Sequence, residues 1–93
     1  MRKTTMVDDR PAFLRDLGFT GSRGQYRKHV GIVGSMISGD TAYAVVVTRM
    51  PFGAPWRAET TANGTVIGTM FGSDIGVASD AVASVVKHFG PFG

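Results

Sequence analysis

The chain has 93 residues, 43% of them hydrophobic, and this length and composition predict one soluble domain over residues 1–93. The sequence contains no cysteine, which excludes disulfides, thiol chemistry and cysteine-bound metal. No stretch approaches the ~20 apolar residues of a membrane helix. The segment 1–7 carries two basic residues without an apolar run behind them, so we expect a loose N-terminus, no secretory signal and a cytoplasmic protein.

The net charge of +3 is unevenly distributed along the chain. The segment 1–28 holds seven basic and three acidic residues, a balance of +4, whereas the segment 29–93 holds three basic and four acidic residues, a balance of −1. The positive field therefore belongs to the N-terminal third. Two interpretations stay open: the charge serves solubility, or it attracts an acidic partner, either a protein or a nucleic acid.

A short helix is predicted after the N-terminus. Asp9 can cap it, and Pro11 then sits in the first turn, where its missing N–H group is not needed. The apolar residues on one side of this helix are Phe13, Leu14 and Leu17. Gly18 suits the position after the helix because glycine tolerates positive φ, and Phe19 can fold back on the last turn. Two turns are too few for an isolated helix, so packing must hold it.

Two strands are predicted next. After a glycine-spaced loop over 18–24, the hydrophobic period changes to two at Gln25. The residues on one face of this strand are Tyr26, Val30, Ile32 and Met36, and the glycines among them predict a bulge. A tight turn at Ser38–Asp40 leads into the unbroken apolar run Ala42–Val47. That run predicts a central strand, buried on both faces and ended by Pro51.

A hairpin is predicted around Asn63 and Gly64. They separate two β-type runs, 56–62 and 65–71, and a two-residue type I′ turn needs positive φ at both positions. This turn predicts the facing pairs Ala62 with Thr65, Thr60 with Ile67, Ala58 with Thr69, and Trp56 with Phe71. That apolar side should meet the core. The side with Arg57, Glu59, Thr61 and Met70 should face water or a partner.

The clearest helix is the last element. Ser73 can cap it, and Asp74 suits the positive end of the helix dipole. Its apolar residues at helical spacing are Ile75, Ala78, Val82, Val85, Val86 and Phe89. Lys87 and His88 lie in the last turn, before the stop at 90–91. The chain is therefore predicted to be α+β: an antiparallel four-stranded sheet with a short N-terminal helix and a longer C-terminal helix packed on it, in the order α-β-β-β-β-α.

No catalytic constellation is evident in the sequence. A nucleophilic triad needs a histidine beside a nucleophile and a carboxylate, but His29 falls on a strand beside two cations and His88 at a helix end. Asp8 and Asp9 are the one close pair of carboxylates, and they open a helix. Metal-ligand spacing and a nucleotide-type phosphate loop are absent from the sequence. We therefore expect a protein without catalytic residues, bound metal or cofactor.

A basic segment is the sharpest candidate for binding. The glycine loop 21–24 and the strand after it could hold phosphates or an acidic protein surface through exposed amides and cations. The candidate partner-binding residues are Arg23, Tyr26, Arg27, Lys28 and, on the polar side of the hairpin, Arg57. The alternative is a flexible connection with solvated charges.

Two resemblances bear on function. The hairpin, followed by Gly72-Ser73 at the start of the last helix, resembles the layout of double-stranded-RNA-binding domains over 56–86. That family holds phosphates with lysines at the start of its last helix, where this chain has Asp74. The ending from Asn63 through Gly72-Ser73-Asp74 into an alanine-rich helix is similar to that of small phage-encoded anti-CRISPR proteins. These lack catalytic sites and bind a host nuclease complex.

The functional expectation is thus a non-enzymatic binding protein. The first hypothesis is an anti-CRISPR-like inhibitor that binds a host defence nuclease complex, a protein or ribonucleoprotein of the host cytoplasm. The second is a nucleic-acid-binding module that resembles a double-stranded-RNA-binding domain. The third is an assembly subunit, because Phe89, Phe92 and the hairpin edge could form a dimer. A monomer or weak homodimer without membrane contact is expected.

Overall fold

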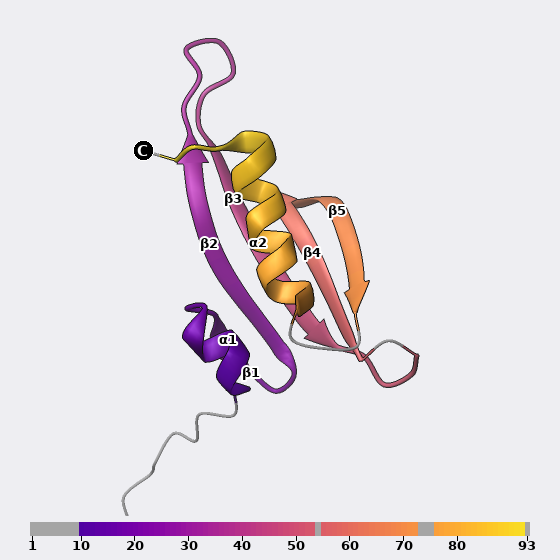
Figure 1. Ribbon diagram of the computed structural model, residues 1–93. Coiled ribbons are helices and arrows are strands. Elements are labelled where there is room, and N and C mark those ends of the chain that lie inside the picture. The colour runs from indigo at the N-terminus through magenta and orange to yellow at the C-terminus, as the bar shows by residue number, and fades with distance from the viewer. Residues whose placement is uncertain (1–9, 54, 73–75, 93) are drawn as a thin grey trace, which may run out of the picture.

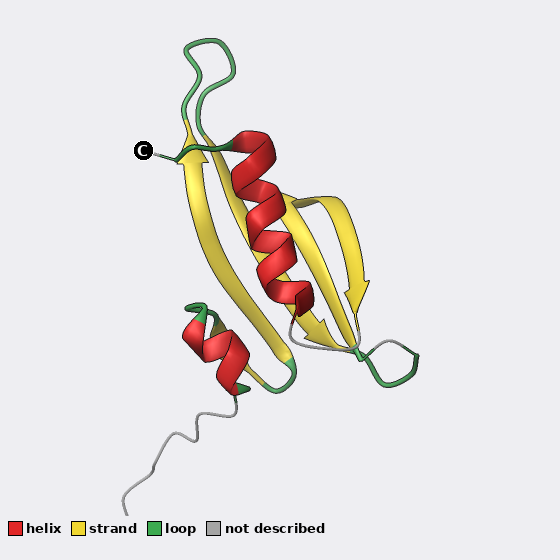
Figure 2. Ribbon diagram, in the orientation of Figure 1, coloured by secondary structure: helices red, strands yellow, loops and turns green. Residues whose placement is uncertain are grey.

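The computed structural model describes residues 10–53, 55–72 and 76–92. Its elements, in chain order, are α1 (Ala12–Asp16), β1 (Thr20–Ser22), β2 (Gln25–Val33), β3 (Thr41–Arg49), β4 (Trp56–Ala62), β5 (Thr65–Gly72) and α2 (Gly76–Phe89). The strands form one antiparallel sheet in the order β1-β2-β3-β4-β5, and α2 lies across one face (Figure 1). The α+β class and both helices are as predicted, but the sheet has five strands and not four (Figure 2).

The fifth strand is β1, which lies within the segment predicted to be a loop. Ser22 pairs with Gln25, so Arg23 and Gly24 form a two-residue turn. Both turn residues have positive φ, 58° and 84°, as a hairpin of this length requires. Arginine is not a usual residue at such a φ, which is why local sequence gives no sign of this turn.

The end of α1 follows the prediction. Gly18 has φ 88°, and the N–H of Phe19 donates to the carbonyl of Leu14 at 2.9 Å, which folds the fully buried Phe19 back against the helix. The start of α1 differs from the prediction, because Pro11 is the N-cap residue and the helix begins at Ala12. Asp9, the predicted cap, lies outside the described residues.

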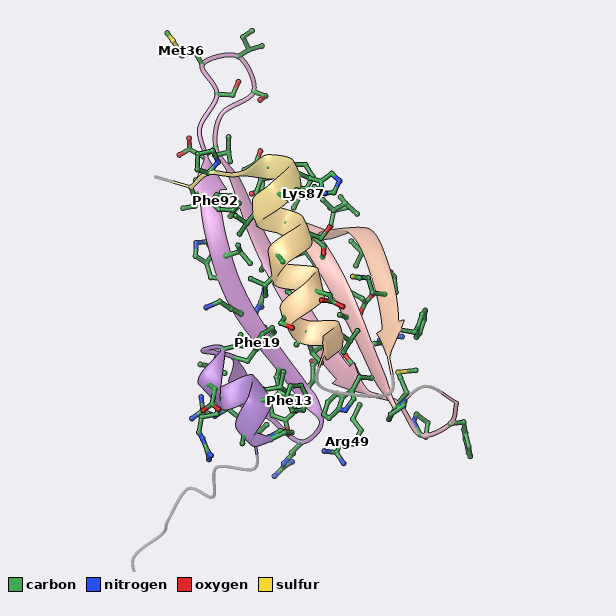
Figure 3. All side chains as sticks on the ribbon, viewed as in Figure 1. Phe13, Phe19, Met36, Arg49, Lys87 and Phe92 are labelled. Atoms are coloured by element: carbon green, nitrogen blue, oxygen red, sulfur yellow. The ribbon has the colours of Figure 1, made fainter. Side chains whose placement is uncertain are left out.

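The core fills the space between the two helices and one face of the sheet. Its buried members are Leu14, Phe19, Tyr26, Val45, Val47, Trp56, Ala58, Val77, Ala78, Ala81 and Val85. Trp56 meets the ring of Phe13 edge-on, with ring centroids 5.6 Å apart. Figure 3 shows Phe13 and Phe19 at the end of the sheet where α1 lies. β3 is the central strand, as its apolar run predicts. The predicted burial on both faces is wrong, because Val45 and Val47 are fully buried whereas Val46 is only half-buried on the opposite face.

The buried face of α2 differs in part from the prediction. Ala78 and Val85 are buried as expected, and so are Val77 and Ala81, whereas Val86 is 45% exposed. The four buried positions form one stripe at the helical period, and Val86 lies beyond its edge. Phe89 is only partly covered, by stacking on Tyr43 with ring centroids 4.4 Å apart. The predicted cap at 73–74 and position 75 lie outside the described residues, and no described helix has the length and apolar character needed to cross a membrane.

The predicted register of the β4–β5 hairpin is wrong beyond its first pairs. Asn63 and Gly64 have positive φ, and Ala62 faces Thr65, as expected. A bulge then adds one residue to β5, so that Trp56 faces Gly72 and Phe71 faces Arg57. Because adjacent residues of a strand point to opposite faces, the extra residue moves Phe71 away from the core. The same shift places Met70 opposite Ala58, on the face that α2 covers.

A bulge in β2 has a similar effect. It lies between His29 and Gly31, within the strand where a bulge was predicted. Beyond it Ile32 faces Ala42 on the uncovered side, and the strand ends at Val33. The prediction that Ile32 and Met36 share the face of Tyr26 is therefore wrong. Met36 stands fully exposed at the tip of the β2–β3 hairpin (Figure 3).

Candidate functional site

The sheet has one face that neither helix covers, and we call it the open face. Strand alternation and register place its residues as follows: Gln25, Arg27 and His29 on β2; Ala44, Val46 and Thr48 on β3; Arg57, Glu59 and Thr61 on β4; Val66, Thr69 and Phe71 on β5. These side chains are mostly polar, and both signs of charge occur among them.

One cross-strand row forms the centre of the open face. Arg27 faces Val46, Val46 faces Glu59, and Glu59 faces Thr69. The row therefore runs from a cation through an aliphatic side chain to a carboxylate. Neighbours within a row lie about 4.5–5.5 Å apart, so one ligand surface can contact the whole row.

The next row adds a second arginine. Arg57 faces Thr48 on one side and Phe71 on the other. Its Nε atom lies 3.3 Å from Oε1 of Glu59, in an ion pair whose side chains are about one third and one quarter exposed. Such partly exposed pairs contribute only about 0–1 kcal/mol to stability. The pair therefore matters chiefly because it keeps opposite charges side by side on this face.

Two polar atoms in this second row have no hydrogen bond within the described structure. They are Oγ1 of Thr48 and Nε of Arg57, both buried. The contact of Arg57 with Glu59 has the distance of an ion pair but not the alignment of a hydrogen bond. Thr61, also buried, donates from its hydroxyl to the carbonyl of Ala44 at 3.4 Å. The polar groups of the open face are thus incompletely satisfied by the chain itself.

An open hollow of about 510 Å³ lies on this face. It is lined by Thr20, Gly21, Gln25, Tyr26, Arg27, Val46, Glu59, Thr61, Gly64 and Val66. Valines form part of its lining, and Arg27 and Glu59 supply the charges. A hollow with an apolar part and charges of both signs suits a protruding side chain or short segment of a partner.

The five predicted binding residues do not form one surface. Arg27 and Arg57 share the open face, and Arg23 lies at the tip of the β1–β2 turn. Lys28 lies on the opposite face, where it faces Val45. Tyr26 is 2% exposed and packs near Trp56, with ring centroids 6.4 Å apart, so its ring is not accessible to a partner.

Of the residues that line the hollow, Arg27 was predicted as a binding residue, and Glu59 and Thr61 were predicted to face water or a partner. Gln25, Val46 and Val66 were not selected from the sequence. Gln25 and Arg27 alternate on β2, and Glu59 and Thr61 alternate on β4, so the period of two was a usable signal. The sequence contains no signal that Val46 lines a hollow, because this residue belongs to a continuous apolar run that is predicted to be buried on both sides.

The described residues give no arrangement that could hold a metal ion: no group of three or more histidine, cysteine, aspartate or glutamate side chains comes together among them. His29 is exposed on the open face. His88 lies at the end of α2, where its Nδ1 is 2.8 Å from the carbonyl oxygen of Ser84. The two imidazoles therefore occupy different parts of the molecule.

No protein-family model matches this sequence, and comparisons with curated proteins and with solved structures find no match either. The function is accordingly inferred from the geometry and charge of the open face.

Proposed function

We propose that this protein is a non-enzymatic binding protein whose open face engages a protein surface. The observation that carries the proposal is the hollow, in which Arg27 and Glu59 flank Val46 on adjacent strands. A binding surface on a sheet needs no moving part, because the strands hold the side chains in fixed register. Binding there can block a partner simply by occupying its surface.

The mixed charge favours a protein partner over nucleic acid. Phosphate binding depends on several cations that together neutralise a uniformly negative backbone. On the open face Glu59 lies in an ion pair with Arg57 and in the same row as Arg27, so a phosphate approaching either arginine also meets a carboxylate. Protein surfaces carry both signs of charge and apolar patches, which this arrangement complements.

The partner that we propose is a host defence nuclease complex, and the protein would act as an anti-CRISPR-like inhibitor. Support comes from the resemblance of the C-terminal segment to that group and from a binding surface that requires no chemistry. An inhibitor of this kind would sequester or obstruct the complex in stoichiometric amounts.

The second candidate is a nucleic-acid-binding module. The observation that favours it is the placement of Arg27 and Arg57 on the open face, with Arg23 at the tip of the adjoining β1–β2 turn. Binding to phosphates would release counterions, and affinity would fall steeply as salt rises from about 50 to 200 mM.

A charge-reversal experiment separates the two candidates. Arg27→Glu changes the open face, whereas Arg15→Glu makes the same change of charge on the exposed side of α1. Each variant would be tested for inhibition of CRISPR interference in cells, and for binding to purified effector complexes and to naked duplex and single strands. We expect Arg27→Glu to weaken inhibition and complex binding at least about tenfold, with Arg15→Glu close to wild type.

Two results would contradict the proposal. Equal loss in both variants would mean that net charge matters and not the open face. Submicromolar, salt-steep binding to naked DNA or RNA that Arg27→Glu abolishes would favour the nucleic-acid-binding module instead.

A further inference from the structure

The strand β5 forms an unprotected edge of the sheet. It is the last strand in the order, and its outer side has no neighbouring strand among the described residues (Figure 1). Its eight residues include no charged residue and no proline. Val66, Ile67, Met70 and Phe71 are all exposed, and Phe71 most of all, at 63%. A long, uncharged and partly apolar edge presents unpaired N–H and C=O groups to any strand that can reach them.

The opposite edge is formed by a shorter strand and by a basic part of β2. β1 has only three residues, and past its end the outer side of β2 carries Lys28 and His29 and then a bulge. Short strands, cations and bulges are the devices that discourage strand pairing. Of these three devices β5 has only a bulge, which lies near its turn. From Gly68 to Gly72 its pairing with β4 is regular. Pairing is therefore expected along 68–72.

We infer that β5 pairs with β5 of a second copy of this chain, antiparallel, to form a homodimer. A strand is always complementary to its own copy in this arrangement, because a two-fold axis perpendicular to the sheet reverses its direction. The segment is uncharged, so the two copies bring no like charges together along the shared edge. Among the described basic residues, Arg27 and Lys28 lie on β2, three strands away from β5 in the sheet.

Symmetry restricts the register of the dimer. A two-fold axis perpendicular to the sheet leaves the open faces of both copies on the same side of the joined sheet. Since directly opposite residues share a face, the residue of β5 at the axis must lie opposite the same residue of the second copy. Met70 is the centre of the regular segment 68–72 and makes the overlap longest. In this register Gly68 faces Gly72 of the second copy. The positions next to Met70 on the same face are therefore all glycines, which leave room for the two methionine side chains.

The dimer would be weak. β5 is about 27 Å long, from about 3.4 Å per residue, and strand pairing along it covers less than the ~800 Å² per partner of a standard interface. A groove of about 170 Å³ between β5 and α2, next to Gly68, can accept additional apolar contact from the second copy. The expected dissociation constant is in the micromolar range. The product is a ten-stranded sheet with both open faces on one side.

Substitutions at Gly68 test this inference. A side chain there meets no atom within 4 Å, its backbone does not have positive φ, and it does not point to the open face. Gly68→Lys places a charge on the edge, while Gly68→Thr adds a side chain without charge. Sedimentation would be measured from about 1 to 500 µM, with circular dichroism to check the fold.

We expect wild type and Gly68→Thr to shift toward twice the monomer mass at high concentration, and Gly68→Lys to stay monomeric. Ala83→Lys, on the exposed side of α2, should dimerise like wild type. Arg27→Glu should also dimerise, which separates this result from the test of the open face. A monomeric wild type over the whole range, or equal dimerisation of Gly68→Lys, would overturn the inference.

Cysteine crosslinking tests the register, and the cysteine-free chain suits it. Residues directly opposite in an antiparallel pair have Cα atoms about 4.5–5.5 Å apart, within reach of a disulfide, whereas diagonal neighbours are about 7–8 Å apart. Met70→Cys should therefore crosslink at least about tenfold faster than Thr69→Cys or Phe71→Cys. Faster crosslinking of either neighbour contradicts the register, and rates no higher than for Ser79→Cys on α2 contradict the dimer.

Discussion

Two glycines of the β4–β5 hairpin allow the contribution of backbone conformation to be measured in isolation. A Cβ added at Gly64 or at Gly68 meets no atom within 4 Å, so neither substitution by alanine creates a clash. Gly64 has φ 86° in the turn, whereas the φ of Gly68 is not positive. The two positions therefore differ mainly in the backbone conformation that the new side chain must adopt.

The expected free energies follow from two opposing effects. Alanine in place of glycine restricts the unfolded chain, which stabilises the folded state by about 0.4–1 kcal/mol at a compatible position. The left-handed conformation costs an L-residue about 1–2 kcal/mol. The first effect is common to both variants, so Gly64→Ala should be less stable than Gly68→Ala by about 1–2 kcal/mol. Gly68→Ala should equal or exceed wild type, and Gly64→Val should lose about 1 kcal/mol or more.

Urea denaturation followed by circular dichroism measures these differences, at a protein concentration low enough to keep the chain monomeric. An unchanged slope of free energy against urea would show that the midpoint shift reports stability. For a domain of this size, 1 kcal/mol corresponds to about 4–8 °C in Tm. Equal stability of the two alanine variants would refute a turn with positive φ at Gly64.

Two further predictions concern the core and the histidines. Phe19→Ala removes a fully buried ring that ties α1 to the sheet, and chemical denaturation should show a loss of about 3–5 kcal/mol; a loss below ~1 kcal/mol would contradict this packing. Combined His29→Ala and His88→Ala should reduce inhibition less than about tenfold, since neither imidazole lines the hollow and neither is assigned a proton-transfer role. A loss of about a hundredfold in a folded double variant would reveal an active site that the present account lacks.

The sequence predicted the elements more successfully than their registers. The turn at Asn63-Gly64 and the end of α1 at Gly18 were recognisable from the sequence. In both cases one or two residues with a strong preference for positive φ determine the local structure. The bulge that moves Phe71 to the open face lies beside Gly68, and a lone glycine within a strand is a weaker signal than a turn dipeptide. The predicted register was extended from the two-residue turn without a bulge. The extra residue in β5 therefore places every later side chain of that strand on the face opposite to the predicted one.

The candidate site was predictable only as separate fragments. Alternation along β4 placed Arg57 and Glu59 on one side, and the basic run on β2 pointed to Arg27. Their association depends on β3 lying between β2 and β4, which is a property of the sheet order and not of either segment. The burial of Tyr26 likewise depends on a distant part of the chain, because its ring packs near Trp56 on β4.

The most direct test of the central claim is methyl NMR of the valines during titration with a purified CRISPR effector complex. Val46 and Val66 line the hollow of the open face, and Val86 is an exposed valine on α2 that serves as an internal control. We predict that the methyl signals of Val46 and Val66 shift on binding while those of Val86 do not. Shifts confined to Val86, or no shifts at any valine, would contradict the proposal that the open face binds this partner.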